Sequence, residues 1–238
     1  MHRPLRNLLH HPAVAEIVIV DDGSSQQEFE YLRETLSELG NPARVRLIRR
    51  EENRGALETK REGVEKASCP WVLVLDSDNT AFCSFLNALS RLREPDPNVF
   101  YAAAWAFPFF PFHPLIGRAL DFDDACRLTR EGTLRRVFII NDGNYLVSRD
   151  AYLQNVNAIG KLASDVADVM VVNYKCLSAG MNLKILPGTA YYHRVHPSSF
   201  WMQTQDESKK RVLQIFSRLD RELRWDSDFL NQLNFQSS

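Results

Sequence analysis

The sequence predicts an α/β fold in which a mostly parallel central sheet has helices on both faces and a small antiparallel extension in the second half. Two observations carry this prediction. Two mostly apolar, largely β-branched runs, at 16–20 and 71–75, have the composition of strands that are buried on both faces. Segments with helical periodicity lie between the strand-like runs, and this alternation is typical of a parallel sheet.

Local patterns in the first half define its elements. Residues 27–39 repeat apolar side chains at helical spacing and are followed by Gly40, a residue that commonly ends helices. We further expect, in chain order, a helix within the first eleven residues, a strand at 44–49, a helix at 56–67 and a helix at 84–93.

The second half is less regular. Residues 99–107 read as a core strand that runs into an aromatic, proline-stiffened loop, which could line an acceptor site, face lipid or simply pack. We expect a helix or flap at 121–132, followed by strands at 137–140 and 145–148 around the turn 141–144. A helix is expected at 165–179, and a strand pair at 183–186 and 189–193 around Pro187-Gly188. The last expected element is an amphipathic helix at 206–224.

Composition is that of an ordinary globular protein, and 238 residues suffice for one domain with a substantial core. A net charge of −1 provides no global attraction for nucleic acid or an anionic membrane. The four scattered cysteines argue against a zinc knot or a disulfide framework, which favours a cytoplasmic location. The start of the chain shows no signal-peptide pattern, and the uncharged run 99–112 is too short and too rich in proline to span a membrane.

Paired aspartates follow the two strand-like runs. Asp21 and Asp22 end the first run, and Asp76 and Asp78 end the second. Because the carboxyl ends of parallel strands share one edge of a sheet, the four carboxylates are expected to converge there. Such a cluster repels itself unless a proton or a cation is present, so the pattern predicts a divalent cation together with the phosphates it carries.

Several stretches, taken together, resemble the family 2 glycosyltransferases, which are inverting nucleotide-sugar enzymes with the Rossmann-like GT-A fold. They cover nearly the whole chain and occur in the order of the family. The matching stretches are EIVIVDDGSS (16–25), NRGALETKREGVEKA (53–67), VLVLDSDN (72–79), NDGNYLVSRDAYL (141–153), DVADVMVVNYKCLSAG (165–180) and YYHRVHPSS (191–199).

The resemblance implies a donor site for a nucleoside diphosphate sugar, expected to be UDP-linked, within residues 1–98. Asp21 and Asp22 would hold the base or ribose, since carboxylates accept hydrogen bonds from both. Asp76 and Asp78 match the DxD motif, in which Asp76 would bind ribose or bridge to the metal and Asp78 would coordinate Mg²⁺ or Mn²⁺. The loop and helix behind the donor would contribute Asn53, Gly55 and Lys60.

The resemblance also implies a general base at the start of the helix that ends near Gly180. Asp165 and Asp168 both fit, and the spacing to Gly180 favours Asp168, although either could instead stabilise the helix dipole. His193 and His196 match a late metal-contacting or diphosphate-contacting position, and one of them is expected to be structural.

Residues 99–205 would form the acceptor and catalytic half. Gly143 and Asn144 match the turn beneath the acceptor pocket, and a plain hairpin turn is the alternative. The acceptor could be a glycan, a lipid or a protein. The C-terminal part, 206–238, could contact a membrane surface or a second copy through its amphipathic helix.

One family feature is missing. The family normally opens with an apolar strand that forms part of the nucleobase pocket, whereas this chain opens with a helix. We therefore expect an unpaired sheet edge and an incomplete base pocket. A degenerate, non-catalytic binding domain is one alternative function. A nucleotidyltransferase is another, but it would need a glycine-rich basic loop that the sequence lacks.

Overall fold

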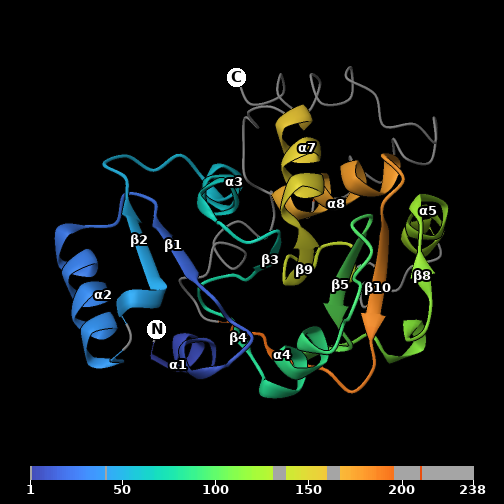
Figure 1. Ribbon diagram of the computed structural model, residues 1–238. Coiled ribbons are helices and arrows are strands. Elements are labelled where there is room, and N and C mark those ends of the chain that lie inside the picture. Colours follow the sequence, from blue (N-terminus) through green and yellow to red (C-terminus); the bar gives the residue numbers. More distant parts are fainter. Residues whose placement is uncertain (1, 41, 131–137, 160–166, 196–209, 211–238) are drawn as a thin grey trace.

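The computed structural model describes residues 2–40, 42–130, 138–159, 167–195 and 210 (Figure 1). Its strands form three sheets, with the orders β1-β2, β3-β9-β5-β10-β8 and β4-β11-β6-β7. The predicted α/β class is confirmed. The sheets are more mixed than expected, because β9 runs antiparallel to both of its neighbours, β3 and β5, and β8 runs antiparallel to β10.

The first half contains the predicted alternation of helices and strands. Ser25 caps α2 with a reciprocal capping box: its hydroxyl accepts from the Glu28 N–H, and the Glu28 carboxylate accepts from the Ser25 N–H. The elements are α1 (His2–His10), β1 (Ile17–Asp21), α2 (Gln26–Glu38), η1 (Pro42–Arg44), β2 (Val45–Arg49), α3 (Ala56–Lys66), β3 (Trp71–Val74), β4 (Thr80–Ala81) and α4 (Cys83–Ser90).

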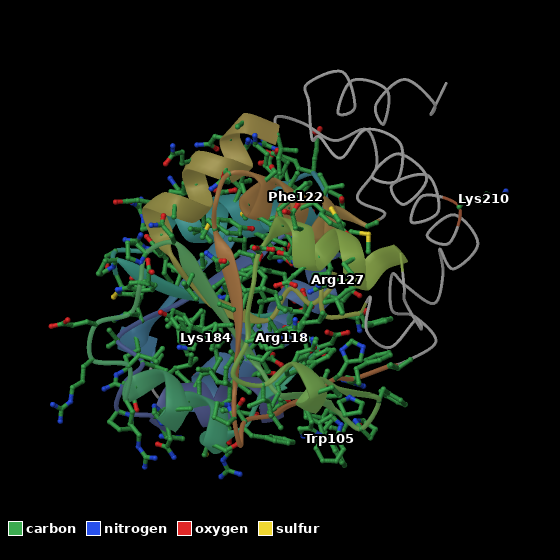
Figure 2. All side chains as sticks on the ribbon, turned by 90° about the vertical axis from the view of Figure 1, so that its right-hand side faces the viewer. Trp105, Arg118, Phe122, Arg127, Lys184 and Lys210 are labelled. Carbon is green, nitrogen blue, oxygen red and sulfur yellow. The ribbon has the colours of Figure 1, made fainter. Side chains whose placement is uncertain are left out.

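The second half supplies the strands that complete the larger sheets. Figure 2 turns one side of this half to the viewer, where Arg118, Phe122 and Arg127 come from the segment around β8 and α5; both arginines pair with Asp124. The elements are β5 (Val99–Ala103), β6 (Trp105–Phe107), β7 (Phe110–Pro111), η2 (His113–Leu115), β8 (Ala119–Leu120), α5 (Phe122–Arg130), β9 (Tyr145–Ser148), α7 (Arg149–Ile159), α8 (Asp168–Ser178), β10 (Asn182–Leu186) and β11 (Tyr191–Tyr192).

Four local predictions were wrong. Residues 138–140 form a turn and not a strand, and 99–107 divides into β5 and β6. The strands β10 and β11 pair with different sheets and not with each other, because β10 lies between β5 and β8 while β11 lies between β4 and β6. The sequence analysis also missed α7, whose buried face consists of Tyr152, Asn155, Val156 and Ile159. The predicted helix at 206–224 lies outside the described residues, apart from Lys210.

The apolar interior has two parts. The larger core lies around the five-stranded sheet and includes the fully buried side chains of Phe85, Phe100 and Tyr174. The smaller core packs Leu5 and Leu9 of α1 against α2 and the β1-β2 pair. Of the helices described, none is long and apolar enough to cross a membrane.

Gly23 allows the turn after β1 to approach the loop after β2. Its φ of +79° is in the left-handed region, and a Cβ at this position would lie 2.7 Å from the backbone nitrogen of Asn53. We expect Gly23→Ala to lower the free energy of unfolding by more than the about 1–3 kcal/mol that one strained backbone residue costs, because the added Cβ would also overlap the Asn53 backbone. Chemical denaturation measures this loss. Gly40→Ala is the matched control, since it has a similar φ but no atom within 4 Å of the added Cβ; a loss at Gly40 as large as that at Gly23 would contradict the role of the close approach.

Candidate functional site

A cleft of about 1430 Å³ lies between β1 and β3 and extends to the ends of both strands. Its mouth is lined by Asp21 and Asp22 after β1, by Asp76 and Asp78 after β3, and by Lys60 from α3. The four aspartates of the two motifs therefore line one cleft, as the strand-end argument predicts. Asn53, Gly55, Asp168 and His193 also line it.

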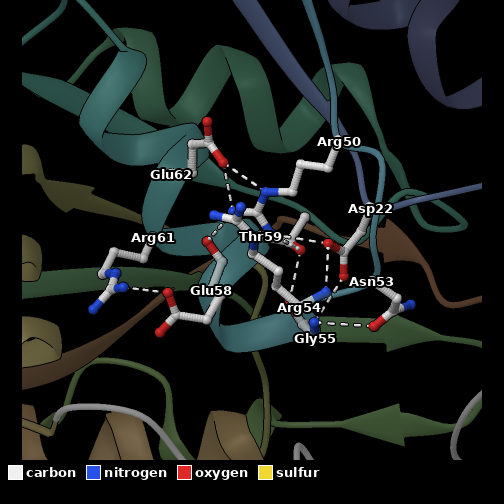
Figure 3. Close-up of polar contacts among 9 residues, drawn as sticks. All are labelled: Asp22, Arg50, Asn53, Arg54, Gly55, Glu58, Thr59, Arg61 and Glu62. Atoms are coloured by element: carbon white, nitrogen blue, oxygen red, sulfur yellow. Dashed lines mark hydrogen bonds and ion pairs between the residues drawn. The ribbon is translucent and has the colours of Figure 1, made fainter.

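Asp22 holds the loop between β2 and α3 (Figure 3). One carboxylate oxygen accepts from the Arg54 N–H at 2.9 Å, and the other accepts from the Gly55 N–H at 2.8 Å. Arg50 donates to the first oxygen at 2.9 Å. Burial alone would raise the pKa of Asp22, but these hydrogen bonds outweigh it, and the pKa lies below its ordinary value. Both oxygens of Asp22 are therefore engaged within the protein.

Arg50 connects this carboxylate to α3 (Figure 3). Its side chain is only 8% exposed and also pairs with Glu62 at 2.5 Å. The same guanidinium donates to the Thr59 hydroxyl and to the Glu58 carbonyl oxygen. Arg50 thus joins the end of β1, the end of β2 and the first turns of α3 in one charged network, which positions Gly55 at the start of α3.

Asp21 has fewer contacts than Asp22. Its residue is 8% exposed, and its nearest cation, the Arg49 Nε, is 4.0 Å from Oδ2, which is beyond hydrogen-bonding distance. Oδ2 has no hydrogen-bond partner within the described parts of the chain. Asp21 is therefore better placed than Asp22 to accept hydrogen bonds from a ligand.

Lys60 lies at the centre of the site. Its ammonium nitrogen is 3.1 Å from Asp76 Oδ1 and 3.5 Å from Asp168 Oδ2, and the Lys60 side chain is 19% exposed. Burial opposes the charge, but the two carboxylates outweigh it and raise the pKa of Lys60. Burial would likewise raise the pKa of Asp76, and the Lys60 charge holds it below its ordinary value. At neutral pH Lys60 and Asp76 are therefore both charged.

Asn144 fixes Asp76 from the other side. Its side-chain oxygen accepts from the Asp76 N–H at 3.0 Å and from the Asn79 amide at 3.2 Å. Its side-chain nitrogen donates to Asp142 at 3.0 Å. Asn144 is 2% exposed, so it supports the end of β3 and does not present a polar surface to the cleft.

Asp142 is a buried carboxylate beneath this contact. One oxygen accepts from the Asn144 backbone and side chain and from the Tyr191 hydroxyl, while Oδ2 has no partner among the residues that the structure describes. Burial raises the pKa of Asp142 to about 7, even though these hydrogen bonds act in the opposite direction. The neutral form of Asp142 is therefore favoured on folding.

Asp142 should make stability depend on pH. In the unfolded chain it ionises near its ordinary pKa of 3.8, whereas in the fold it retains its proton up to about pH 7. Because the folded state binds the extra proton, the stabilisation present below pH 4 is lost as the pH rises toward 7. We expect Asp142→Asn, which mimics the neutral acid, to flatten this part of the profile and to raise stability by up to about 4 kcal/mol at pH 8. Urea denaturation from pH 4 to 8 measures both effects, and an unchanged slope would contradict the assignment.

His193 and Asp78 are the described residues best suited to a metal at this mouth. The Nδ1 atom of His193 is buried and has no hydrogen-bond partner in the described part of the chain, and burial lowers its pKa despite the nearby charges of Asp76 and Asp78. Neutral imidazole and carboxylate oxygen both bind divalent metals. No group of three or more His, Cys, Asp or Glu side chains that could hold a metal is present among the described residues. The donor set therefore fits an ion that takes its other ligands from a bound diphosphate.

Asp168 begins α8 directly after a strained residue. The preceding Ala167 has a φ of 62°, in the left-handed region, and Asp168 is 9% exposed in the first helical turn. Positive φ at a residue other than glycine is often found at functional sites. Asp165 and His196, the alternatives proposed for the base and for the histidine ligand, lie outside the described residues.

Gly143 lies between α8 and Lys60. A Cβ at this position would be 3.0 Å from Val169 Cγ2 and 3.6 Å from Lys60 Nζ. The segment 141–144 therefore packs under the charged centre. Asn144 and Asp142 of this segment support that centre. Their supporting roles, like that of Arg50, were not predicted from the sequence. The NDGN motif at 141–144 could have indicated a role for Asp142, whereas no sequence pattern around Arg50 indicates a role for that residue.

Comparison with known proteins agrees with this architecture. The crystal structure of TarS from S. aureus matches 98% of the chain with a TM-score of 0.57 and 14% identity. A mannosyltransferase from Pyrobaculum calidifontis, PcManGT, solved with GDP-Man and Mn²⁺, matches 97% with a TM-score of 0.60 and 17% identity. GalNAc-T7, solved with UDP, GalNAc and Mn²⁺, matches 92% with a TM-score of 0.51 and 14% identity. The fold is thus that of the GT-A glycosyltransferases.

The sequence itself matches the family described as Glycosyl transferase family 2 over residues 3–109. This match covers slightly less than half of the chain and supports the resemblance that the motifs carry. It spans 39% of the TarS chain, 48% of GalNAc-T7 and 63% of PcManGT. A search of curated proteins gave no match.

Proposed function

We propose that this chain is the donor-binding and catalytic part of an inverting, metal-dependent glycosyltransferase that uses a nucleoside diphosphate sugar, with UDP as the expected nucleotide. The observation that carries the proposal is the position of Lys60, within 3.1 Å of Asp76 and 3.5 Å of Asp168. It brings the first DxD carboxylate and the candidate base to one point of the cleft. Inverting transfer needs a base that removes the proton of the acceptor hydroxyl, whose oxygen attacks the sugar carbon opposite the leaving diphosphate.

Each group at the mouth then has a role. Asp21 accepts from the base or ribose, and Asp22 positions Asn53 and Gly55 behind the donor. Lys60 attracts the diphosphate, and Asp168 removes the proton of the acceptor hydroxyl. Asp78 and His193, with Asp76 beside them, would hold Mg²⁺ or Mn²⁺, which neutralises diphosphate charge when bound. Support for a metal and a nucleotide sugar also comes from two similar structures, which were solved with Mn²⁺ and with UDP or GDP-Man.

The acceptor half, residues 99–205, presents an aromatic surface beside the mouth. Phe107, Phe109 and Tyr192 are 37%, 47% and 40% exposed, and the Phe109 ring lies 6.3 Å from the His193 ring. We propose that the acceptor approaches over this surface, whether it is a glycan, a lipid or a protein.

Nucleotide titration tests the donor site. We expect UDP to bind in the presence of Mn²⁺, with GDP weaker, and Asp78→Ala to remove the metal-dependent part of the affinity. Calorimetry with UDP and GDP, each with and without Mn²⁺, measures this. Asp123→Ala, at an exposed aspartate of α5, is the matched control and should bind like the parent. Absence of binding to either nucleotide would favour the alternative of a non-catalytic domain.

A further inference from the structure

Two segments that lie far apart in the sequence meet at the mouth of the cleft. The first is the turn 76–79 after β3, which carries Asp78, and the second is the segment 193–195 after β11, which begins with His193. Residues of both segments line the cleft. Because each segment supplies one candidate metal-binding side chain, the relative position of the two segments decides whether these side chains can bind the same ion.

A short strand pair brings the two segments together. The strand β4 follows the turn directly and pairs antiparallel with β11, so that Thr80 lies opposite Tyr192. On its other side β11 pairs with β6, and the His193 N–H donates to the Phe107 carbonyl oxygen at 2.8 Å. On the β4 side the ladder stops at the Thr80–Tyr192 pair, before either candidate ligand is reached.

Asn79 makes the contact that continues beyond this ladder. Its side-chain oxygen accepts from the Arg194 N–H at 3.1 Å, across 115 positions of the sequence. Its side-chain nitrogen donates to Asn144 Oδ1 at 3.2 Å and lies 3.4 Å from Asp76 Oδ2. The Asn79 N–H closes the turn by donating to the Asp76 carbonyl oxygen at 3.0 Å. One residue therefore joins both segments and the support beneath Asp76.

The contacts of Asn79 require an amide at this position. The residue is 1% exposed, and its side chain needs an acceptor toward the Arg194 N–H and a donor toward Asn144 Oδ1. That Asn144 oxygen already accepts from the Asp76 N–H, so its orientation is fixed. The reversed amide would place two donors against each other at one end and two acceptors at the other. Asn79 is thus committed to contacts within the protein.

Aromatic side chains restrict the imidazole ring of His193. The ring centroids of Phe109, Phe110 and Tyr191 lie 6.3, 5.8 and 6.2 Å from that of the imidazole, all in edge-to-face orientation. Because these rings limit rotation of the imidazole, its distance from the turn 76–79 depends on where the backbone of the histidine segment is held.

We propose that Asn79 is a positioning residue that holds the candidate ligands Asp78 and His193 in register before a metal binds. This inference rests on the proposed function, because it assumes that these two side chains bind the ion. Asn79 acts through the backbone of the two segments and contacts neither the ion nor the donor. Its loss should therefore weaken the contribution of the metal to donor binding and leave metal-free nucleotide binding unchanged.

Calorimetry on the full chain tests this inference with UDP as the probe, in buffer without and with Mn²⁺. The readout is the ratio of the two UDP dissociation constants. We expect Asn79→Ala to reduce this ratio about tenfold, the lower end of the effect of removing a supporting contact around a metal. Asn155→Ala is the matched control and should keep the parent ratio. Asn155 is also a buried asparagine, 8% exposed, but it donates to the Ala151 carbonyl oxygen within α7.

A double-mutant cycle shows whether Asn79 acts through His193. In a His193→Ala background, Asn79→Ala should reduce the ratio by no more than about twofold, because the ligand that it positions is already absent. A reduction as large as in the parent background would show that Asn79 acts by another route.

Hydrogen exchange of the metal-free protein supplies a readout that needs no ligand. The Arg194 amide should exchange about tenfold or more faster in Asn79→Ala than in the parent, because its acceptor has been removed. Asn79→Asp should keep this amide protected, since a carboxylate oxygen also accepts from an N–H. Equal exchange in all three proteins would contradict the contact on which the inference is built.

The outcomes separate this inference from the proposed function. An unchanged ratio in folded Asn79→Ala, or an equal reduction in Asn155→Ala, would overturn the inference alone. If Mn²⁺ does not strengthen UDP binding by the parent, the proposed metal site fails and the inference fails with it. Urea denaturation establishes that each variant is folded. If Asn79→Ala does not fold, Asn79→Ser is measured with the same expectations, since its shorter side chain also loses the Arg194 contact but keeps a polar group.

Discussion

Replacement of Asp168 by asparagine should lower the turnover rate of sugar transfer by about 10²–10⁴-fold, the usual contribution of a general base. An amide has the size of the carboxylate but cannot accept the proton of the acceptor hydroxyl. Nucleotide affinity should remain close to that of the parent, because Asp76 still holds Lys60 at 3.1 Å. Hydrolysis of a UDP-sugar, in which water replaces the acceptor, measures the rate without knowledge of the acceptor.

Asp165→Asn is the comparison that identifies the base. Only one of the two variants should lose turnover while still binding UDP, and we expect it to be Asp168→Asn, because the Asp168 carboxylate lies 3.5 Å from Lys60. A loss at Asp165 alone would assign the base to that residue. A loss of UDP binding in Asp168→Asn would show that Asp168 mainly holds Lys60 in place. Denaturation curves of both variants separate these results from unfolding.

The charge balance of the mouth differs from the simplest expectation. Four aspartates at two strand ends suggest that an external cation must neutralise all of them. The structure instead supplies Arg50 for Asp22 and Lys60 for Asp76, and both pairs are within 3.1 Å. A bound metal would therefore balance the charge of the diphosphate and of the aspartates outside these two pairs, which include Asp21, whose nearest cation is 4.0 Å away, and not that of the whole cluster. This agrees with a site that supplies few protein ligands of its own.

Local pattern predicted most helices but not the pairing of strands. The helix α2 was predictable because Leu32 and Leu36 repeat on one buried face. The position of β9 between β3 and β5 was not, because it depends on contacts between distant parts of the chain. Ile139 and Ile140 show a second limit: both are 0% exposed, yet they lie in a turn. A short apolar run predicts burial and not the conformation that is buried.

The same distinction applies to the candidate site. Asp21 and Asp76 were predictable because polar residues at the ends of parallel strands line a common edge. Arg50 was not, because its partners Asp22 and Glu62 lie 28 and 12 residues away in the sequence. Asn144 was recognised as part of a turn, but its contact with the Asp76 backbone, 68 residues away, required the fold.

Replacement of Arg50 by methionine should lower the free energy of unfolding by about 3–5 kcal/mol, the usual result of removing one partner from a buried ion pair. Methionine preserves much of the length of the side chain but removes its charge and all of its donors. Asp22 and Glu62, with side chains only 17% and 24% exposed, would both lose their cation. Urea denaturation measures the loss. Arg46→Met is the matched control and should cost about 1 kcal/mol, since the exposed Arg46 makes one hydrogen bond, to the Lys66 carbonyl oxygen.

Arg50→Lys separates the charge of this residue from its geometry. A lysine retains one positive charge but cannot donate at once to Asp22, Glu62, Thr59 and the Glu58 carbonyl as the guanidinium does. If the forked geometry positions Gly55 through Asp22, Arg50→Lys should recover part of the stability but little of the nucleotide affinity. Equal recovery of both would show that the charge alone is required. Full UDP affinity in a folded Arg50→Met protein would remove the loop between β2 and α3 from the proposed donor site.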